Sequence, residues 1–292
     1  MYRQRRRKRR SWRGAALFAA VIAVIILTVY GSVKLITLSN GSGDSINSDV
    51  SAQALDPADE NEYVEKIRAA YSRSDAIENI IEHIDMYSTT LLDALLAKPE
   101  MVEFVEGYIT HKQYGFENAD NIDISGEYTP GEIPLFIQWD KRWGYETYGT
   151  DLMALNACGP TCMAMIYVGL TGDTSENPLS IAEMSIKNHY YYDYQGTSTE
   201  LITDGAGKLG LHYSQLSASS EAVLGSLRAG RPVMVNVGPG DFTSYGHYIV
   251  LTGIDENGKI KVNDPNSPIK SSKVWDVDRI VEQSFTIWSI WK

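Results

Sequence analysis

The C-terminal part of this 292-residue chain is predicted to fold as an α+β domain, in which a layer of helices precedes an antiparallel sheet. Two observations predict this order. Apolar residues recur at helical spacing between Met163 and Leu170, and again over residues 219–229. From Pro232 onward the period changes to two, so that strands are expected over residues 232–237, 248–254 and 259–263, near Trp275, and over residues 285–291.

The N-terminus combines a basic run with a charge-free stretch. Eight of the first thirteen residues are Lys or Arg, and residues 14–33 carry no charge. Twenty helical residues at about 1.5 Å each match a hydrocarbon core of ~30 Å. We therefore expect a basic cytoplasmic tail at residues 1–13 and an uncleaved transmembrane signal anchor at residues 14–38. A cleavable signal peptide is the alternative, although its apolar part is usually only about 7–15 residues long.

The distribution of charge indicates where the rest of the chain lies and what it binds. The positive-inside rule keeps the arginines in the cytoplasm and puts the residues beyond about 38 outside the cell. The whole chain has a net charge of −11, and residues 41–292 contain 17 basic and 37 acidic residues. We expect no nucleic-acid partner for this acidic part, because it repels polyanions.

Two segments separate the anchor from the C-terminal domain. Residues 39–59 are rich in Ser, Asn, Asp and Gly and are expected to form a flexible linker. Residues 60–130 are expected to contain three or four short helices and then an acidic connector that leads into the domain at residues 131–292. The apolar faces of these helices must be buried against another part of the protein. The pattern leaves open whether they brace the C-terminal domain or shield it like a pro-segment.

Cys158 stands at the expected start of the first helix of the C-terminal domain. Gly159 and Pro160 follow it, and proline is well tolerated in a first helical turn, where its missing N–H has no partner to lose. The helix dipole and the unpaired N–H groups favour a thiolate there, the form of cysteine that attacks carbonyl carbon. Cys162 is expected to be a small buried helix residue, since a disulfide between the two cysteines would distort the helix.

A histidine and an acid that suit such a thiol follow on a predicted hairpin with an Asn-Gly turn. One register pairs Ile254 with Lys259. It puts Asp264 on the same face of the sheet as His247, because side chains alternate along a strand. The register set by a two-residue turn does the same, whereas a bulge would reverse the face. A carboxylate beside His247 can fix the imidazole tautomer and stabilise its charged form.

The remaining patterns predict no metal and no organic cofactor. Two cysteines four residues apart, without a neighbouring histidine, make a poor zinc site. The G-x-G-x-x-G match at residues 205–210 follows a helical pattern and lacks a βαβ unit, so dinucleotide binding is not expected. The tyrosines of residues 190–194 have two interpretations, the lining of a peptide-binding groove or aromatic packing in the core.

Four motifs occur in order: FIQWDKRWG at residues 136–144, CGPT at 158–161, GHYIVL at 246–251 and VNDP at 262–265. They resemble the papain-like cysteine peptidases related to bacteriocin leader-processing enzymes, the C-thirty-nine-like peptidase family, in its exported bacterial form. The resemblance covers about residues 133–292 and implies a papain-like fold, with Cys158 as nucleophile, His247 as base and Asp264 as orienting residue. In papain-like enzymes a glutamine ahead of the cysteine donates to the oxyanion. Leu152 occupies its usual position here, so Gln138 is the nearest candidate.

These features predict a membrane-anchored extracellular cysteine peptidase that hydrolyses peptide or related amide bonds of a peptide or protein substrate. Cys158 is expected to form a thioacyl-enzyme while His247 receives and returns the proton. Two alternatives stay open: a catalytically silent peptide-binding surface module, and acyl transfer to an amine, as in transglutaminases.

Overall fold

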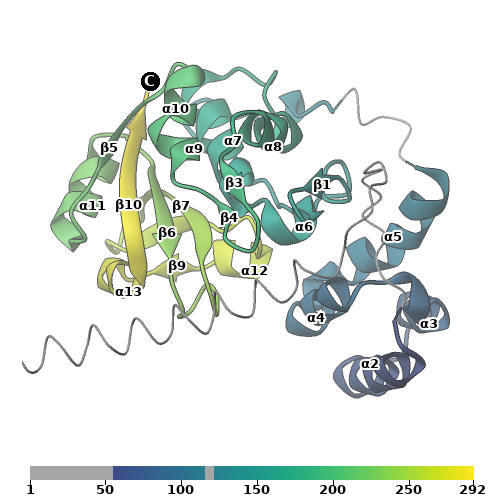
Figure 1. Ribbon diagram of the computed structural model, residues 1–292. Coiled ribbons are helices and arrows are strands. Elements are labelled where there is room, and N and C mark those ends of the chain that lie inside the picture. The colour runs from purple at the N-terminus through teal and green to yellow at the C-terminus, as the bar shows by residue number, and fades with distance from the viewer. Residues whose placement is uncertain (1–54, 116–121) are drawn as a thin grey trace, which may run out of the picture. The chain divides into compact units, whose positions relative to one another are not determined.

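The computed structural model describes residues 55–115 and 122–292. Helices come first in the chain (Figure 1): α2 (Pro57–Ala70), α3 (Asp75–Glu82), α4 (Thr89–Ala97) and α5 (Val102–Tyr114), with the 3₁₀ turns η1 (Ile84–Met86), η2 (Pro99–Met101) and η4 (Ser125–Glu127). The predicted set of three or four short helices over residues 60–111 is therefore confirmed. Side-chain caps begin α2, α3 and α4, from Asp56, Ser74 and Ser88.

The predicted linker at residues 39–59 runs too far into the chain. Asp56 caps α2 and Pro57 occupies its first turn, so the helix begins before residue 60. The rest of that linker up to residue 54, the basic tail at residues 1–13 and the signal anchor at residues 14–38 lie outside the described residues. No helix within residues 55–115 and 122–292 has the length and apolarity that crossing a membrane requires.

Short helices and two small hairpins open the C-terminal part. The helices are α6 (Met153–Asn156), α7 (Cys158–Thr171), α8 (Pro178–Lys187), α9 (Glu200–Thr203) and α10 (Gly205–Lys208). The hairpins are β1 (Thr147–Tyr148) with β2 (Asp151–Leu152), and β3 (Tyr191–Tyr192) with β4 (Gly196–Thr197). Residues 200–208 form two separate helices, because the backbone leaves helical geometry at Asp204.

A six-stranded antiparallel sheet follows, in the order β5-β10-β6-β7-β8-β9. Its strands are β5 (His212–Gln215), β6 (Val233–Val237), β7 (His247–Ile254), β8 (Ile260–Asn263), β9 (Val274–Trp275) and β10 (Ser284–Trp291), and the helices α11 (Ser220–Arg228), α12 (Pro268–Ser271) and α13 (Val277–Glu282) accompany them. The predicted α+β class is confirmed. Strand β5 was not expected, because all four of its side chains are exposed and show no alternation.

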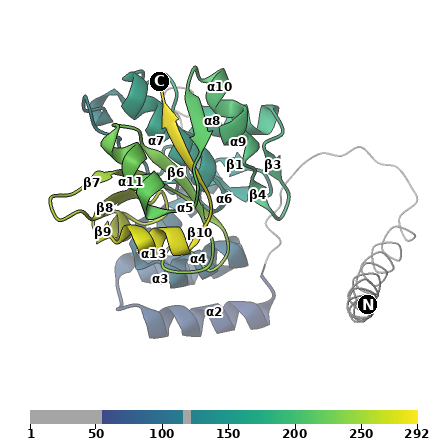
Figure 2. The same cartoon turned by 90° about the vertical axis from the view of Figure 1, so that its left-hand side faces the viewer.

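Period-two alternation gives the sheet two apolar faces. Met234 and Val250 belong to the cluster built around α7, whereas their neighbours Val235 and Ile249 pack with α11 and α13. Figures 1 and 2 show α11 and α13 on one side of the sheet and α7 to α10 on the other. Burying each such side chain contributes about 1.5–3 kcal/mol, so both helical layers hold the sheet.

The hairpin of β7 and β8 contains two departures from the predicted register that cancel. At the turn Ile254 pairs with Ile260, so the predicted pairing of Ile254 with Lys259 is wrong by one residue. A bulge in β7 then takes up that residue, and Val250 pairs with Asn263. Beyond the bulge the register is therefore the predicted one, and it brings the residue after β8 toward the start of β7.

The helices α2 to α5 share a core with the start of the C-terminal part. Tyr145 and Ala154 belong to the same buried cluster as Leu92 and Phe104. The Tyr145 hydroxyl donates to the Phe104 carbonyl at 2.7 Å, and the two rings stack with centroids 4.3 Å apart. These helices therefore pack directly against the segment that precedes α7.

Candidate active site

Cys158 is the first residue of α7, as its Gly-Pro context predicted. Its side chain is partly exposed, whereas Cys162, one turn further along the same helix, is buried. The first residue of a helix is one whose backbone N–H has no partner inside that helix, and the helix dipole concentrates positive potential there. The fold thus offers the sulfur of Cys158 to a reactant and surrounds it with groups that stabilise negative charge.

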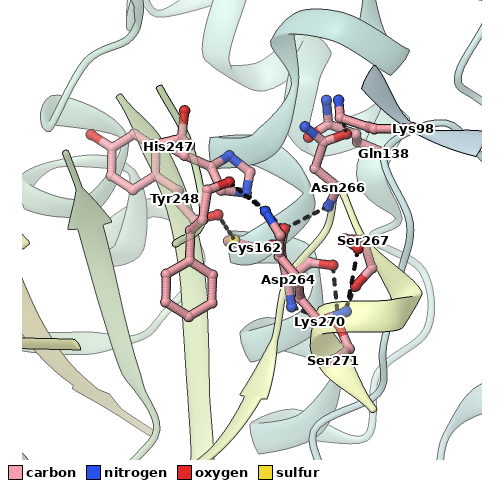
Figure 3. Close-up of polar contacts among 12 residues, drawn as sticks. Lys98, Gln138, Cys162, His247, Tyr248, Asp264, Asn266, Ser267, Lys270 and Ser271 are labelled. Carbon is pink, nitrogen blue, oxygen red and sulfur yellow. Dashed lines mark hydrogen bonds and ion pairs between the residues drawn. The ribbon is translucent and has the colours of Figure 1, made fainter. Parts of the chain in front are cut away.

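His247 and Asp264 lie in direct contact although seventeen positions separate them in sequence. The imidazole Nε2 is 2.7 Å from the Asp264 carboxylate oxygen Oδ1 (Figure 3), and His247 is only 6 % exposed. The imidazole also acts on Cys158, because its hydrogen bonding and charge lower the pKa of that thiol. Because Nε2 contacts the carboxylate, Nδ1 is the ring nitrogen left to act on the thiol. The structure therefore places His247 and Asp264 in contact, and the thiol pKa of Cys158 responds to that imidazole.

Asp264 is fully buried, and its loop is fixed by its own hydrogen bonds. The oxygen Oδ1 that contacts His247 also accepts from the backbone N–H of Asn266 at 2.8 Å. The backbone N–H of Asp264 donates to Ser271 Oγ at 2.9 Å (Figure 3). Its second oxygen, Oδ2, has no hydrogen-bond partner among the described residues. The carboxylate is thereby aimed at the imidazole by one oxygen only.

The electrostatics of the site favour a thiolate beside an imidazolium. Burial raises the pKa of the Cys158 thiol, but the hydrogen bond from His247, its charge, and the backbone N–H groups of Tyr248 and Gly159 together hold that pKa below its ordinary value. Burial lowers the pKa of His247, but the charge and hydrogen bond of Asp264 outweigh it and raise that pKa to about 9. Both shifts act in the same direction: they favour the proton on the imidazole and the negative charge on the sulfur.

Cys162 has the opposite environment. Its thiol donates to the Tyr248 carbonyl at 3.3 Å, and burial raises its pKa well above the ordinary value (Figure 3). A thiol that stays protonated and enclosed is unreactive toward electrophiles. The two cysteines of the chain thus differ sharply in chemistry.

Gln138 lies between the turn that leads into α7 and the acid loop, the name used here for residues 264–267, which begin at Asp264. Its backbone N–H donates to the Pro265 carbonyl at 2.7 Å, and its side-chain Nε2 donates to the Ala154 carbonyl, also at 2.7 Å. The side chain is 1 % exposed, and Oε1 has no hydrogen-bond partner in the described part of the chain. Gln138 is therefore held close to both ends of the site by two separate bonds.

Gly159 keeps the first turn of α7 close to strand β4. A Cβ atom at this position would lie 2.6 Å from Thr197 Cγ2, inside van der Waals contact. We predict that Gly159→Ala displaces Cys158 and lowers kcat/KM about 100-fold, the cost of misplacing a reacting group by about 1 Å. Gly207→Ala is the matched control, since no atom lies within 4 Å of its Cβ. Equal activity of the two variants in a peptide hydrolysis assay would contradict the prediction.

Sequence reasoning missed the contribution to this site of the helical region, which consists of α2 to α5 and the turns between them. Lys98, between α4 and η2, donates to Asn266 Oδ1 at 2.9 Å, and Glu100 accepts from Ser267 Oγ at 2.9 Å. Neither contact has a signal in spacing or motif, because it joins residues more than 160 positions apart. The described residues contain no group of three or more His, Cys, Asp or Glu able to hold a metal ion, and the expected absence of a cofactor stays a prediction.

Comparison with known proteins places this site within one family. The family model described as Peptidase_C39 like family matches residues 131–292. Among solved structures, the chain is similar to the peptidase domain of Streptococcus ComA, described as a bifunctional ABC transporter involved in a quorum sensing pathway. The identity is 24%, the match covers 47% of this chain and 90% of that chain, and the TM-score is 0.35. No curated protein matches the chain.

Proposed function

Because this chain belongs to the Peptidase_C39 like family, we propose that it is a cysteine peptidase that hydrolyses peptide bonds through Cys158, His247 and Asp264 in a papain-like arrangement. One observation carries the proposal. A partly exposed thiol stands at the first position of α7, His247 lowers the pKa of that thiol, and a buried carboxylate contacts the imidazole at 2.7 Å. This order of groups is the one that activates a cysteine nucleophile.

The proposed reaction has two halves. In the first, the Cys158 sulfur forms a bond to the substrate carbonyl carbon, and the oxygen takes up negative charge. The carbon–nitrogen bond then breaks while His247 Nδ1–H gives its proton to the leaving amine, which yields a thioacyl-enzyme. In the second, His247 takes a proton from water, whose oxygen attacks the thioester and releases the acid. The thiolate returns, and Asp264 keeps Nε2–H in place throughout.

We assign Gln138 and the backbone N–H of Cys158 as donors to the developing oxyanion. One N–H of Gln138 Nε2 is used by Ala154, and the other is left to reach a substrate oxygen. Gln138→Ala is expected to lower kcat about 100-fold to 1000-fold, the usual loss when one oxyanion donor is removed. The rate of Cys158 alkylation by iodoacetamide should be unchanged, because that reaction forms no oxyanion. A parallel loss of alkylation would show that Gln138 only supports the site.

A peptide library tests the proposed activity directly. The purified full-length chain is incubated with the library, and new termini are identified by mass spectrometry. Hydrolysis by the wild-type chain supports the proposal. Amides formed with added amines in place of acids would indicate acyl transfer, and retention of uncleaved peptides by the wild-type chain and the Cys158→Ala variant alike would indicate a binding module. Peptides trapped on Cys158→Ala also report the substrate.

We further propose that residues 14–38 anchor the enzyme in the membrane with the catalytic part outside the cell. Support comes from the charge-free residues 14–33 and from the eight Lys and Arg residues that precede them in residues 1–13. In intact cells that produce the chain with a C-terminal tag, external protease should remove the tag while the tail at residues 1–13 stays protected. A tag that resists protease until the cells are lysed would contradict this orientation.

A further inference from the structure

We propose that Lys98 is a positioning residue of the active site, which holds the loop after Asp264 in place from the helical region and thereby keeps the carboxylate against His247. The inference rests on the proposed function of that site. It assigns a role to a residue outside residues 131–292, the part that the family model matches. The helical region then acts as a permanent brace of the active site, which decides between the two roles that the sequence left open.

Two neighbouring side chains of the helical region bond to two neighbouring residues of the acid loop. Lys98 Nζ donates to Asn266 Oδ1 at 2.9 Å (Figure 3). Ser267 Oγ donates to Glu100 Oε1 at 2.9 Å, and Ser267 is buried. A cation on one residue and an anion two positions later thus match an acceptor and a donor on the facing loop. Such paired, charge-assisted bonds fix the loop in position as well as in orientation.

The loop that Lys98 holds is the one that carries the catalytic acid. The backbone N–H of Asn266 donates to Asp264 Oδ1, the same oxygen that contacts His247 Nε2. The backbone N–H of Ser267 donates to the Asp264 carbonyl at 3.2 Å. A shift of Asn266 therefore moves the carboxylate relative to the imidazole. Lys98 reaches His247 through only two intermediate residues.

Lys98 itself is rigidly mounted. Its backbone N–H donates to the Leu95 carbonyl at 3.1 Å, and its carbonyl accepts from Met101 N–H at 3.0 Å. Leu95 and Met101 are both fully buried. Pro99 restricts the backbone of Lys98 to the extended conformation that it adopts. The lysine therefore departs from a fixed point between α4 and η2 and is a suitable anchor for a loop.

The charge of Lys98 also acts on the nucleophile. Burial lowers the pKa of Lys98, the negative charges of Asp264, Glu100 and Cys158 raise it, and the positive charge of Lys270 lowers it. Coupling between two charges is reciprocal, so a cation stabilised by the thiolate stabilises the thiolate to the same extent. The positive charge of His247 faces the same sulfur and acts in the same direction.

The test measures the pH dependence of Cys158 alkylation by iodoacetamide in the full-length chain, with the labelled site read by mass spectrometry. In Lys98→Met, which keeps the length of the side chain without its charge, the acid limb of the profile should move to higher pH by about half a unit or more. The value of kcat should fall about tenfold with little change in KM, because the substrate is not held by Lys98. Lys98→Arg should keep most of the wild-type profile.

Lys66→Met is the matched control, since Lys66 is an exposed lysine of the same helical region that pairs with Glu62. Its profile should coincide with the wild-type profile. If Lys98→Met does not fold, Lys98→Ala provides the second neutral variant, because it also removes both the charge and the hydrogen bond to Asn266. A neutral variant that melts at a lower temperature but keeps the wild-type acid limb and kcat would overturn the proposal and leave a merely structural contact.

Alkylation reports the resting thiol and does not require turnover, so the two proposals fail separately. An unchanged acid limb in a neutral Lys98 variant, with peptide hydrolysis intact in the wild-type chain, would overturn the role of Lys98 alone. A shifted acid limb without any hydrolysis in the wild-type chain would support the influence of Lys98 on the thiol and overturn the peptidase proposal.

Discussion

Replacement of Cys158 by alanine is expected to lower kcat/KM by up to about 10⁶-fold, the loss seen when the nucleophile of a catalytic triad is removed. No other group of the site can form the thioacyl bond, since His247 and Asp264 act only through the sulfur. The variant should fold normally, because the substitution removes only the sulfur of a partly exposed side chain at the first position of α7.

Cys162→Ala is the control for this variant, since it removes the other thiol of the chain from the same helix. Cys162 is buried, and its raised thiol pKa keeps it protonated. Its loss should cost about 1–2 kcal/mol of stability through a small cavity, and kcat/KM should stay within about threefold of the wild-type value. Both variants are compared by hydrolysis of the same peptide and by thermal melting. Full turnover by Cys158→Ala would remove the proposed mechanism.

Replacement of Asp264 by alanine is expected to lower kcat/KM by about 10⁴-fold, the loss that accompanies a wrong histidine tautomer in a triad. The carboxylate is buried and contacts His247 Nε2 at 2.7 Å, so no solvent group can take its place. Without it, the neutral tautomer with the proton on Nε2 is no longer favoured, and the imidazolium loses its counter-charge.

Asp264→Asn separates the shape of the acid from its charge. The amide oxygen can still accept from His247 Nε2, so the loss of activity should be smaller than in Asp264→Ala. The pKa of His247 is lowered by burial and raised to about 9 mainly by the Asp264 charge, so neutralising residue 264 should lower it. The alkaline limb of the kcat/KM profile should then move to lower pH. An alkaline limb that stays in place in Asp264→Asn would show that Asp264 does not control the imidazole.

The parts of this structure that local chemistry determines were predictable. A Gly-Pro pair after Cys158 marks the first turn of a helix whatever the surrounding fold, and α7 does begin at Cys158. Alternation along residues 232–254 likewise defines two strands and their buried faces. The contact between His247 and Asp264 followed from that alternation, although the turn register was wrong by one residue and a bulge corrected it.

The features that depend on tertiary packing were not predictable from one sequence. Strand β5 is exposed on all four residues and forms because β10 offers a free edge, so no periodicity marks it. The bond from Lys98 to Asn266 joins elements 168 residues apart, and nothing in the spacing distinguishes this lysine from an exposed one. Sequence patterns identify a residue by its own chemistry. The role proposed for Lys98 depends instead on its position at the end of α4, which brings its side chain to Asn266.

The measurement that tests the central claim most directly compares the pH profiles of Cys158 alkylation and peptide hydrolysis in the wild-type chain. The pKa of the Cys158 thiol is lowered, so the alkylation rate should rise at a lower pH than for an ordinary thiol, which titrates at about 8.5, and then stay constant. Hydrolysis should follow the same acid limb and then fall through about pH 9, where His247 loses the proton that the leaving amine needs. Mass spectrometry should find the label on Cys158. Alkylation that appears only above pH 8, or on Cys162 alone, would contradict the thiolate–imidazolium pair on which the account depends.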